Sequence, residues 1–155
     1  MFPVFEYNAE DLVASEAPDG FNAITSHSEY ACHAGPIFER IYTDEKGNEQ
    51  WERGFRVLPK HTNAGAMAHG GLLMTFADVL LATAVFKRLP PPFVTVKMTS
   101  EFLGRAPVGA WVTGKAWMVK RTGSLAFLEG QLMIDSKIIF TVSGIFKHRA
   151  GKEYG

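Results

Sequence analysis

The sequence has a single cysteine, Cys32, among its 155 residues. One thiol cannot form an internal disulfide and has no cysteine partner for a cysteine-based metal site, so disulfide-stapled scaffolds and zinc fingers are excluded. Net charge is also absent, because sixteen Lys and Arg residues balance sixteen Asp and Glu residues. Without an overall field to attract nucleic acid or an anionic membrane surface, we expect neither as a partner.

Long hydrophobic runs are missing as well. The most apolar stretch, Gly70 to Phe86, is shorter than a membrane-spanning helix requires and contains Asp78, whose charge would be costly in lipid. The N-terminal residues MFPVFEYNAEDL are acidic and have no basic region before an apolar run, unlike a signal or transit peptide. We therefore expect a cytoplasmic protein without a membrane span.

The length permits one domain and is too short for two hydrophobic cores. Within a single domain over residues 1–155, we expect an N-terminal extension of loops and one short helix at 1–36 and a core at 37–148. Two β-like runs, Ile37 to Thr43 and Glu49 to Val57, are separated by a polar turn and predict a hairpin.

One long helix is predicted from Gly70 or Gly71 to about Leu89, because the three prolines that follow exclude the helical conformation. Three further strands are expected at residues 110–120, 124–135 and 137–147. Before them, a half-buried strand is predicted by alternation of two sets of residues: Val94, Val96, Met98, Ser100 and Phe102, and Thr95, Lys97, Thr99 and Glu101.

Helices and strands are thus segregated along the chain, which indicates an α+β fold with an antiparallel sheet. A helix that is apolar almost all round must be covered on every side. We therefore expect the sheet to curl around this helix and a second copy of the chain to cover the remainder.

The segment HTNAGAMAHGGLLMTFADVLLATAVF holds the residues suited to catalysis. Asn63 lies in a predicted loop, His69, Gly70 and Gly71 at the helix start, and Asp78 in mid-helix. Glycines at a helix N-terminus leave backbone N–H groups open to a ligand, and the helix dipole favours negative charge there, as an oxyanion site requires. Asp78 lies roughly 12 Å further along the axis, so a carboxylate acting with Gly70 must come from a neighbouring subunit.

The spacing of Asn63, the HGG of residues 69–71 and Asp78, followed by strands with the turn KRTGSLAF, resembles the hotdog-fold acyl-CoA thioesterases of the phenylacetic-acid-degradation (PaaI) type. The resemblance spans about Phe38 to Lys147. It implies an antiparallel sheet wrapped around one long central helix, and hydrolysis of an acyl-CoA to a free acid and coenzyme A. Coenzyme A is then part of the substrate, and no separate cofactor is expected.

The resemblance also implies roles for single residues. Asp78 matches the family's acidic residue that activates or positions the attacking water, and Gly70 matches the backbone donor to the thioester carbonyl. His69 and Asn63 match loop residues that shape this site. We expect a homodimer, and a dimer of dimers as a larger assembly. The predicted contacts for coenzyme A, whose phosphates need cationic and hydrogen-bonding partners, are Gly71, Arg121 and Ser124.

Two positions depart from the family pattern. Ala66 stands where members often have glycine, which occurs here at Gly65, and Gly104 stands where some members place a hydroxyl that helps to hold water. Two alternatives stay open, because a fold does not fix the class of reaction. One is a hotdog dehydratase or hydratase acting on acyl thioesters, and the other is a non-catalytic acyl-CoA or lipid-binding module, which the Gly104 departure favours. His69 alone is more typical of a cap or loop brace than of a general base. With His61 it would make two metal ligands without a third, so no metal site is predicted.

Overall fold

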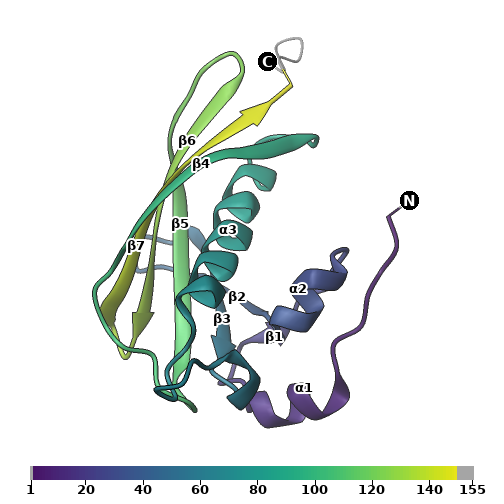
Figure 1. The fold of residues 1–155 in the computed structure, drawn as a ribbon. Helices are drawn as coiled ribbons and strands as arrows, with labels where there is room; N and C mark the ends of the chain where they lie inside the picture. The colour runs from purple at the N-terminus through teal and green to yellow at the C-terminus, as the bar shows by residue number, and fades with distance from the viewer. Residues whose placement is uncertain (1, 150–155) are drawn as a thin grey trace.

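In the computed structural model, which describes residues 2–149, one antiparallel sheet curls along the long helix α3 (Figure 1). The strand order is β1-β2-β3-β5-β6-β7-β4. The helices are α1 (Ala9–Ser15), α2 (Glu29–Ala34) and α3 (Gly70–Phe86), with a 3-10 turn at Pro59–His61. The strands are β1 (Asn22–Ala23), β2 (Phe38–Thr43), β3 (Glu49–Arg56), β4 (Phe93–Phe102), β5 (Trp111–Arg121), β6 (Leu125–Ile134) and β7 (Lys137–His148).

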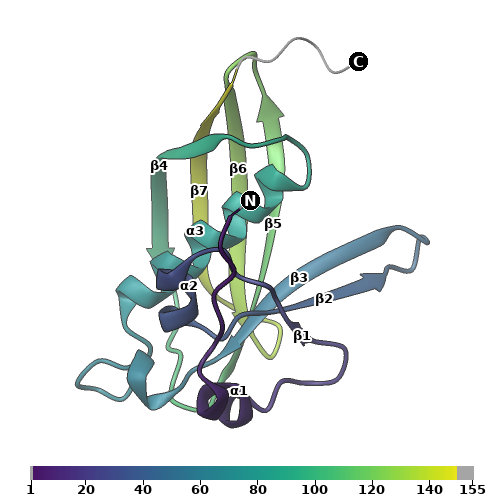
Figure 2. The ribbon, with the colours of Figure 1, turned by 90° about the vertical axis from the view of Figure 1, so that its right-hand side faces the viewer.

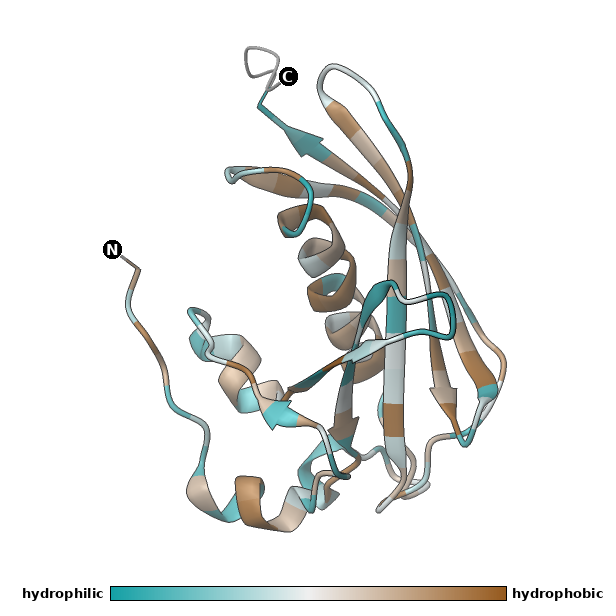
Figure 3. Ribbon diagram, turned by 180° about the vertical axis from the view of Figure 1, so that it is seen from behind, coloured by the Kyte–Doolittle hydropathy of each residue, from teal (hydrophilic) through white to brown (hydrophobic). Residues whose placement is uncertain are grey.

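Helix α3 supplies the centre of the hydrophobic core, and its apolar turns are brown in Figure 3. One face is buried against the sheet through Leu73, Phe76, Ala77, Leu80, Leu81, Ala84 and Val85. Glycines in the sheet allow this close approach, because a Cβ built at Gly114 would lie 2.8 Å from Leu80 Cδ2 and one at Gly144 would lie 2.6 Å from Leu81 Cδ1. The antiparallel sheet around a central helix was predicted and is confirmed.

The helix ends three residues earlier than expected, at Phe86. Lys87 caps it and donates its N–H to Thr83 O, and the following residues continue in turns up to Leu89, whose N–H bonds Val85 O. The prolines therefore stop the chain from turning helically again, but the regular helix has already ended. Within residues 2–149, no helix is both long enough and apolar enough to cross a membrane.

Strand β4 lies at the edge of the sheet, and the regular alternation predicted for it is interrupted in its first half. A bulge between Thr95 and Lys97 places Thr95 opposite Phe146 and Met98 opposite Gly144. The extra residue reverses the alternation. Thr95 therefore reaches α3, whereas Val94 and Val96 remain 61% and 56% exposed.

The N-terminal extension contains more regular structure than the single short helix predicted. Helix α1 is capped by Asn8, whose side chain accepts the N–H groups of Glu10 and Asp11, and α2 is capped by Ser28, which accepts the N–H of Ala31. These local bonds satisfy backbone donors that short helices otherwise leave open. Strand β1 then pairs with β2, so the extension is part of the same sheet.

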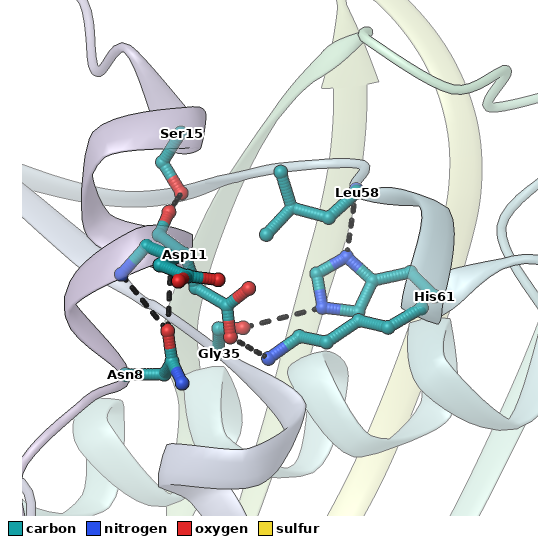
Figure 4. A network of polar contacts seen from close by, with 8 residues as sticks. Asn8, Asp11, Ser15, Gly35, Leu58 and His61 are labelled. Atoms are coloured by element: carbon teal, nitrogen blue, oxygen red, sulfur yellow. Dashed lines mark hydrogen bonds and ion pairs between the residues drawn. The ribbon is translucent and has the colours of Figure 1, made fainter.

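The β2–β3 hairpin was predicted and is confirmed; it projects from the body of the molecule in Figure 2. The buried His61 joins the 3-10 turn to the end of α2 through hydrogen bonds (Figure 4). His61 Nδ1 accepts the N–H of Leu58 at 2.9 Å, so its Nε2, 3.2 Å from Gly35 O, is the donor. Burial is the main cause that lowers the pKa of His61, and neighbouring Lys60 adds to it.

Candidate active site

Asp78 lies on the part of α3 that the core does not bury, and it borders a cleft of about 790 Å³. One wall comes from α3 and the start of β4, and the other from the segment between β1 and α2. Beyond Asp78, α3 lines the cleft with Val79, Ala82, Thr83 and Phe86, of which all but Thr83 are apolar, and β4 adds Phe93. The cleft thus combines a carboxylate with an apolar lining, as small-molecule sites commonly do.

The hydroxyl of Thr95 holds the Asp78 carboxylate. Thr95 Oγ1 donates to Asp78 Oδ1 at 2.7 Å, whereas Asp78 Oδ2 has no hydrogen-bond partner within residues 2–149. The carboxylate is therefore fixed through one oxygen, and the other can interact with water or substrate. Sequence reasoning missed Thr95, because no motif marks it and the bulge that turns it toward α3 leaves no clear signal in the sequence.

Gly104, where some family members have a hydroxyl that helps to hold water, lies away from Asp78. It donates its N–H to Ile139 O at 3.0 Å and borders a separate hollow next to Arg105. Asp78 therefore has a hydroxyl partner in Thr95, although Gly104 carries none.

Helix α2 closes over the cleft through Tyr30. Thr75 Oγ1 donates its proton to Gly71 O at 3.0 Å. Tyr30 OH lies 3.0 Å from Thr75 Oγ1 and must therefore be the donor in that contact. Thr75 lies one helical turn before Asp78. The N-terminal extension is therefore tied to the helix face that carries the carboxylate.

The start of α3 has the cap that the sequence indicates. His69 Nδ1 accepts the N–H of Gly71 at 2.9 Å, so the Gly71 amide is already engaged and is not the free donor that the double glycine predicts. The N–H of Gly70 has no partner among residues 2–149. Gly70 is therefore the open donor at this helix terminus.

Asn63 braces the loop before the helix. Its Oδ1 accepts the N–H of Gly65 at 2.9 Å, and Thr62 and Ala68 pair across the base of the loop. Ala66, at the other departure from the family pattern, has a positive φ of 56°, a conformation that glycine adopts more easily. Loop, cap and open amide thus form one structural unit.

The structure separates the predicted site residues. Asp78 lies apart from the others, beside Thr95, which the sequence did not predict. Asn63, His69, Gly70 and Gly71 lie together at the start of α3, roughly 12 Å away along the helix axis. Arg121 and Ser124 join neither group, because they are exposed at the β5–β6 turn, at the other end of the sheet from the start of α3 (Figure 1).

Within residues 2–149, no three His, Cys, Asp or Glu side chains lie close enough together to hold a metal ion. His61, the histidine considered with His69, has both ring nitrogens hydrogen-bonded to backbone. Its role is therefore structural.

Arg53 of β3 also borders the Asp78 cleft. Its Nε donates to Glu39 Oε2 at 3.2 Å, and Lys87 Nζ lies 3.6 Å from the other oxygen of Glu39. Burial lowers the pKa of the Arg53 guanidinium and Glu39 opposes this shift, and the group stays charged at physiological pH.

Known proteins share this fold and this sequence pattern. Residues 65–138 match the model of the thioesterase superfamily. The Pseudomonas aeruginosa protein named "Putative esterase PA0474" is 36% identical over 131 residues, which cover 83% of this chain and 95% of that protein.

Two solved structures illustrate the shared architecture. A variant of the phenylacetic acid degradation protein PaaI from Thermus thermophilus has a TM-score of 0.66 at 19% identity, covering 79% of this chain and 100% of that one. The "Hypothetical Thioesterase Protein" of Streptococcus pneumoniae TIGR4, solved with coenzyme A, has a TM-score of 0.63 at 16% identity, covering 74% and 88%. The chain therefore belongs to the thioesterase superfamily, with the hotdog fold predicted from its sequence, and it is a thioester hydrolase.

Proposed function

We propose that this thioester hydrolase cleaves acyl-CoA to a free acid and coenzyme A, at a site formed by two copies of the chain. The observation that carries the proposal is the half-buried Asp78 carboxylate in its cleft, held by Thr95 through one oxygen only. A carboxylate fixed in this way can orient and deprotonate a water molecule or attack a carbonyl itself. The similar Streptococcus pneumoniae fold solved with coenzyme A supports this substrate class.

The second half of the site is the N–H of Gly70. It is open at the N-terminus of a 17-residue helix, whose dipole adds partial positive charge where an oxyanion develops. Gly70 and Asp78 of one chain are separated by roughly 12 Å of helix axis, which is too far for both to act on one carbonyl. In a two-fold dimer with antiparallel helices, Asp78 of one subunit meets Gly70 of the other, and two equivalent sites result.

The reaction follows from this arrangement. The thioester carbonyl oxygen accepts the N–H of Gly70 while the water oxygen bonds to the carbonyl carbon and Asp78 takes the proton. The C–S bond then breaks, and the proton passes to the leaving thiolate. In the second route, an Asp78 oxygen bonds to the carbonyl carbon first, the C–S bond breaks and the thiolate leaves as coenzyme A. Water then hydrolyses the resulting anhydride to the free acid and the Asp78 carboxylate, and the proton it releases neutralises the thiolate.

Coenzyme A needs further contacts outside these groups. Gly71 borders a hollow of about 440 Å³ at the start of α3, beside Lys60. Arg121 and Ser124 are exposed at the β5–β6 turn, so we propose that they contact the nucleotide part from another subunit.

Release of free thiol from acyl-CoAs of short, medium, long and aryl types tests the proposal, with the wild type compared with Asp78→Asn. We expect turnover by the wild type and a loss of about 10²–10⁴-fold in the variant, typical of a lost general base. Size-exclusion chromatography of both proteins checks that the assembly is unchanged. Binding without thiol release by the wild type would contradict the proposal, and so would formation of an unsaturated or hydrated acyl-CoA in place of free thiol.

A further inference from the structure

Arg53 gives the Asp78 cleft a positively charged wall. The Asp, Glu, Lys and Arg side chains that line this cleft within residues 2–149 are Asp78 and Arg53. The Arg53 side chain is only 15% exposed. Phe55, two residues further along β3, is buried in the core, so both side chains project from the sheet face that α3 covers.

The charge of Arg53 is only partly compensated. Glu39 pairs with Arg53 and with Lys87, so two cations share one carboxylate. Glu39 lines a separate hollow of about 470 Å³, which Arg53 also borders, and does not line the Asp78 cleft. The bond to Glu39 uses Nε, and the two terminal nitrogens of Arg53 make no hydrogen bond within the described part of the chain. Neither of them is among the fully buried, unpaired polar atoms of the described residues, so both keep some access to solvent on a side chain that borders the cleft.

The cleft between the two charged groups suits an acyl chain. Val79, Ala82 and Phe86 continue along α3 from Asp78 and form an apolar wall, which Phe93 and Ile24 complete. From Asp78 to Phe86 the helix axis extends roughly 12 Å. On β3, Arg53 lies between Phe55, whose ring packs on Phe76, and Trp51, whose ring lies under Lys87 Nζ, so Arg53 faces the stretch of α3 between Phe76 and Lys87. An acyl group that extends from Asp78 toward Phe86 therefore runs along apolar side chains on the stretch of α3 that Arg53 faces.

We propose that Arg53 binds a carboxylate at the far end of the acyl group, so that the preferred substrates are CoA thioesters of dicarboxylic acids. This inference rests on the proposed hydrolysis of acyl-CoA at Asp78. The terminal nitrogens of a guanidinium match the two oxygens of a carboxylate, and an acyl group with an uncharged end would leave these donors without that partner. A neutral acyl chain would still fill the apolar part of the cleft.

Pairs of substrates with equal chain length test the inference. Adipoyl-CoA is compared with hexanoyl-CoA, and suberoyl-CoA with octanoyl-CoA, by kcat/KM for thiol release. We expect the wild type to prefer the dicarboxylic member of at least one pair by about 10- to 100-fold, the range for a charge-assisted pair. Arg53→Met should bring this ratio close to one, and Arg53→Lys should restore part of it.

Two further variants control for folding and for charge. Arg56→Met removes another arginine of β3, which bonds to Ser15, Glu16 and Gly109 backbone and does not line the cleft, so it should keep the wild-type ratio. Glu39→Gln removes the competing carboxylate, keeps Arg53, and should raise the ratio. If Arg53→Met does not fold, the ratio of kcat/KM values within each substrate pair is measured for Arg53→Lys and Glu39→Gln, and these two ratios test the role of Arg53.

The outcomes separate the two proposals. Equal rates within each pair, or equal losses for both members in Arg53→Met, would overturn the role of Arg53 and leave acyl-CoA hydrolysis intact. Absence of thiol release from every acyl-CoA would overturn the hydrolysis and the role of Arg53 with it.

Discussion

Thr95 donates a hydrogen bond of 2.7 Å to the carboxylate of Asp78, joining the edge strand β4 to the middle of α3. The bond exists because the bulge after Thr95 changes which side chains of β4 face the helix. It fixes one carboxylate oxygen and leaves the other without a hydrogen-bond partner among residues 2–149. In the proposed mechanism, Thr95 is the residue that positions the base.

Thr95→Val should lower kcat about tenfold, the effect of losing one hydrogen bond to a charged group. Thr95→Ser keeps the hydroxyl and should stay close to the wild type. Steady-state kinetics of thiol release with both variants measures this effect. An undiminished kcat in Thr95→Val would show that Asp78 does not depend on this bond.

Gly70→Pro removes the proposed oxyanion donor and keeps the helix, because proline is favoured at the first helical position. The extended conformation of His69 also suits the residue before a proline. We expect kcat to fall about 10²–10³-fold, as when an oxyanion-hole donor is lost.

Gly70→Ala is the matched control for this substitution. It adds a Cβ, 3.2 Å from the ring of Phe102, and keeps the N–H. Most of the activity should survive in this variant. Equal losses in the two variants would mean that crowding against Phe102, and not the missing donor, is responsible.

His69→Asn should keep both the stability and the activity, because its side-chain oxygen can accept the N–H of Gly71 as His69 Nδ1 does. His69→Ala should reduce the free energy of unfolding by about 1 kcal/mol. Urea unfolding and the pH dependence of kcat measure the two effects. A loss of activity in folded His69→Asn, with a changed pH profile, would instead identify His69 as an acid or base.

His61 makes the stability depend on pH. Because its pKa is lowered in the folded protein, the unfolded chain binds more protons below about pH 6.5. The free energy of unfolding should therefore fall as the pH decreases below that value, by at most about 1.4 kcal/mol per pH unit from this group. Urea unfolding between pH 5 and pH 8 measures the slope. His61→Gln should have a shallower slope, and identical slopes would exclude His61 as the cause.

The sequence predicted the sheet, the hairpin and the central helix because hydrophobic periodicity and prolines mark them directly. It predicted the His69 cap and the open Gly70 amide because both depend on neighbours in the chain. It failed at Thr95, since a bulge is set by how β4 pairs with β7 and not by the local pattern. Arg53 was missed for a related reason: only the folded sheet brings β3 beside the face of α3 that carries Asp78.

The central claim is that each site combines Asp78 of one subunit with Gly70 of the other. Mixing Asp78→Asn with Gly70→Pro, each inactive alone, tests it after the subunits are exchanged by reversible unfolding. A mixed dimer has one site with both residues intact, so an equal mixture should regain about one quarter of the wild-type rate of thiol release. If each site lies within one chain, every chain in the mixture has a defect, and no activity should return.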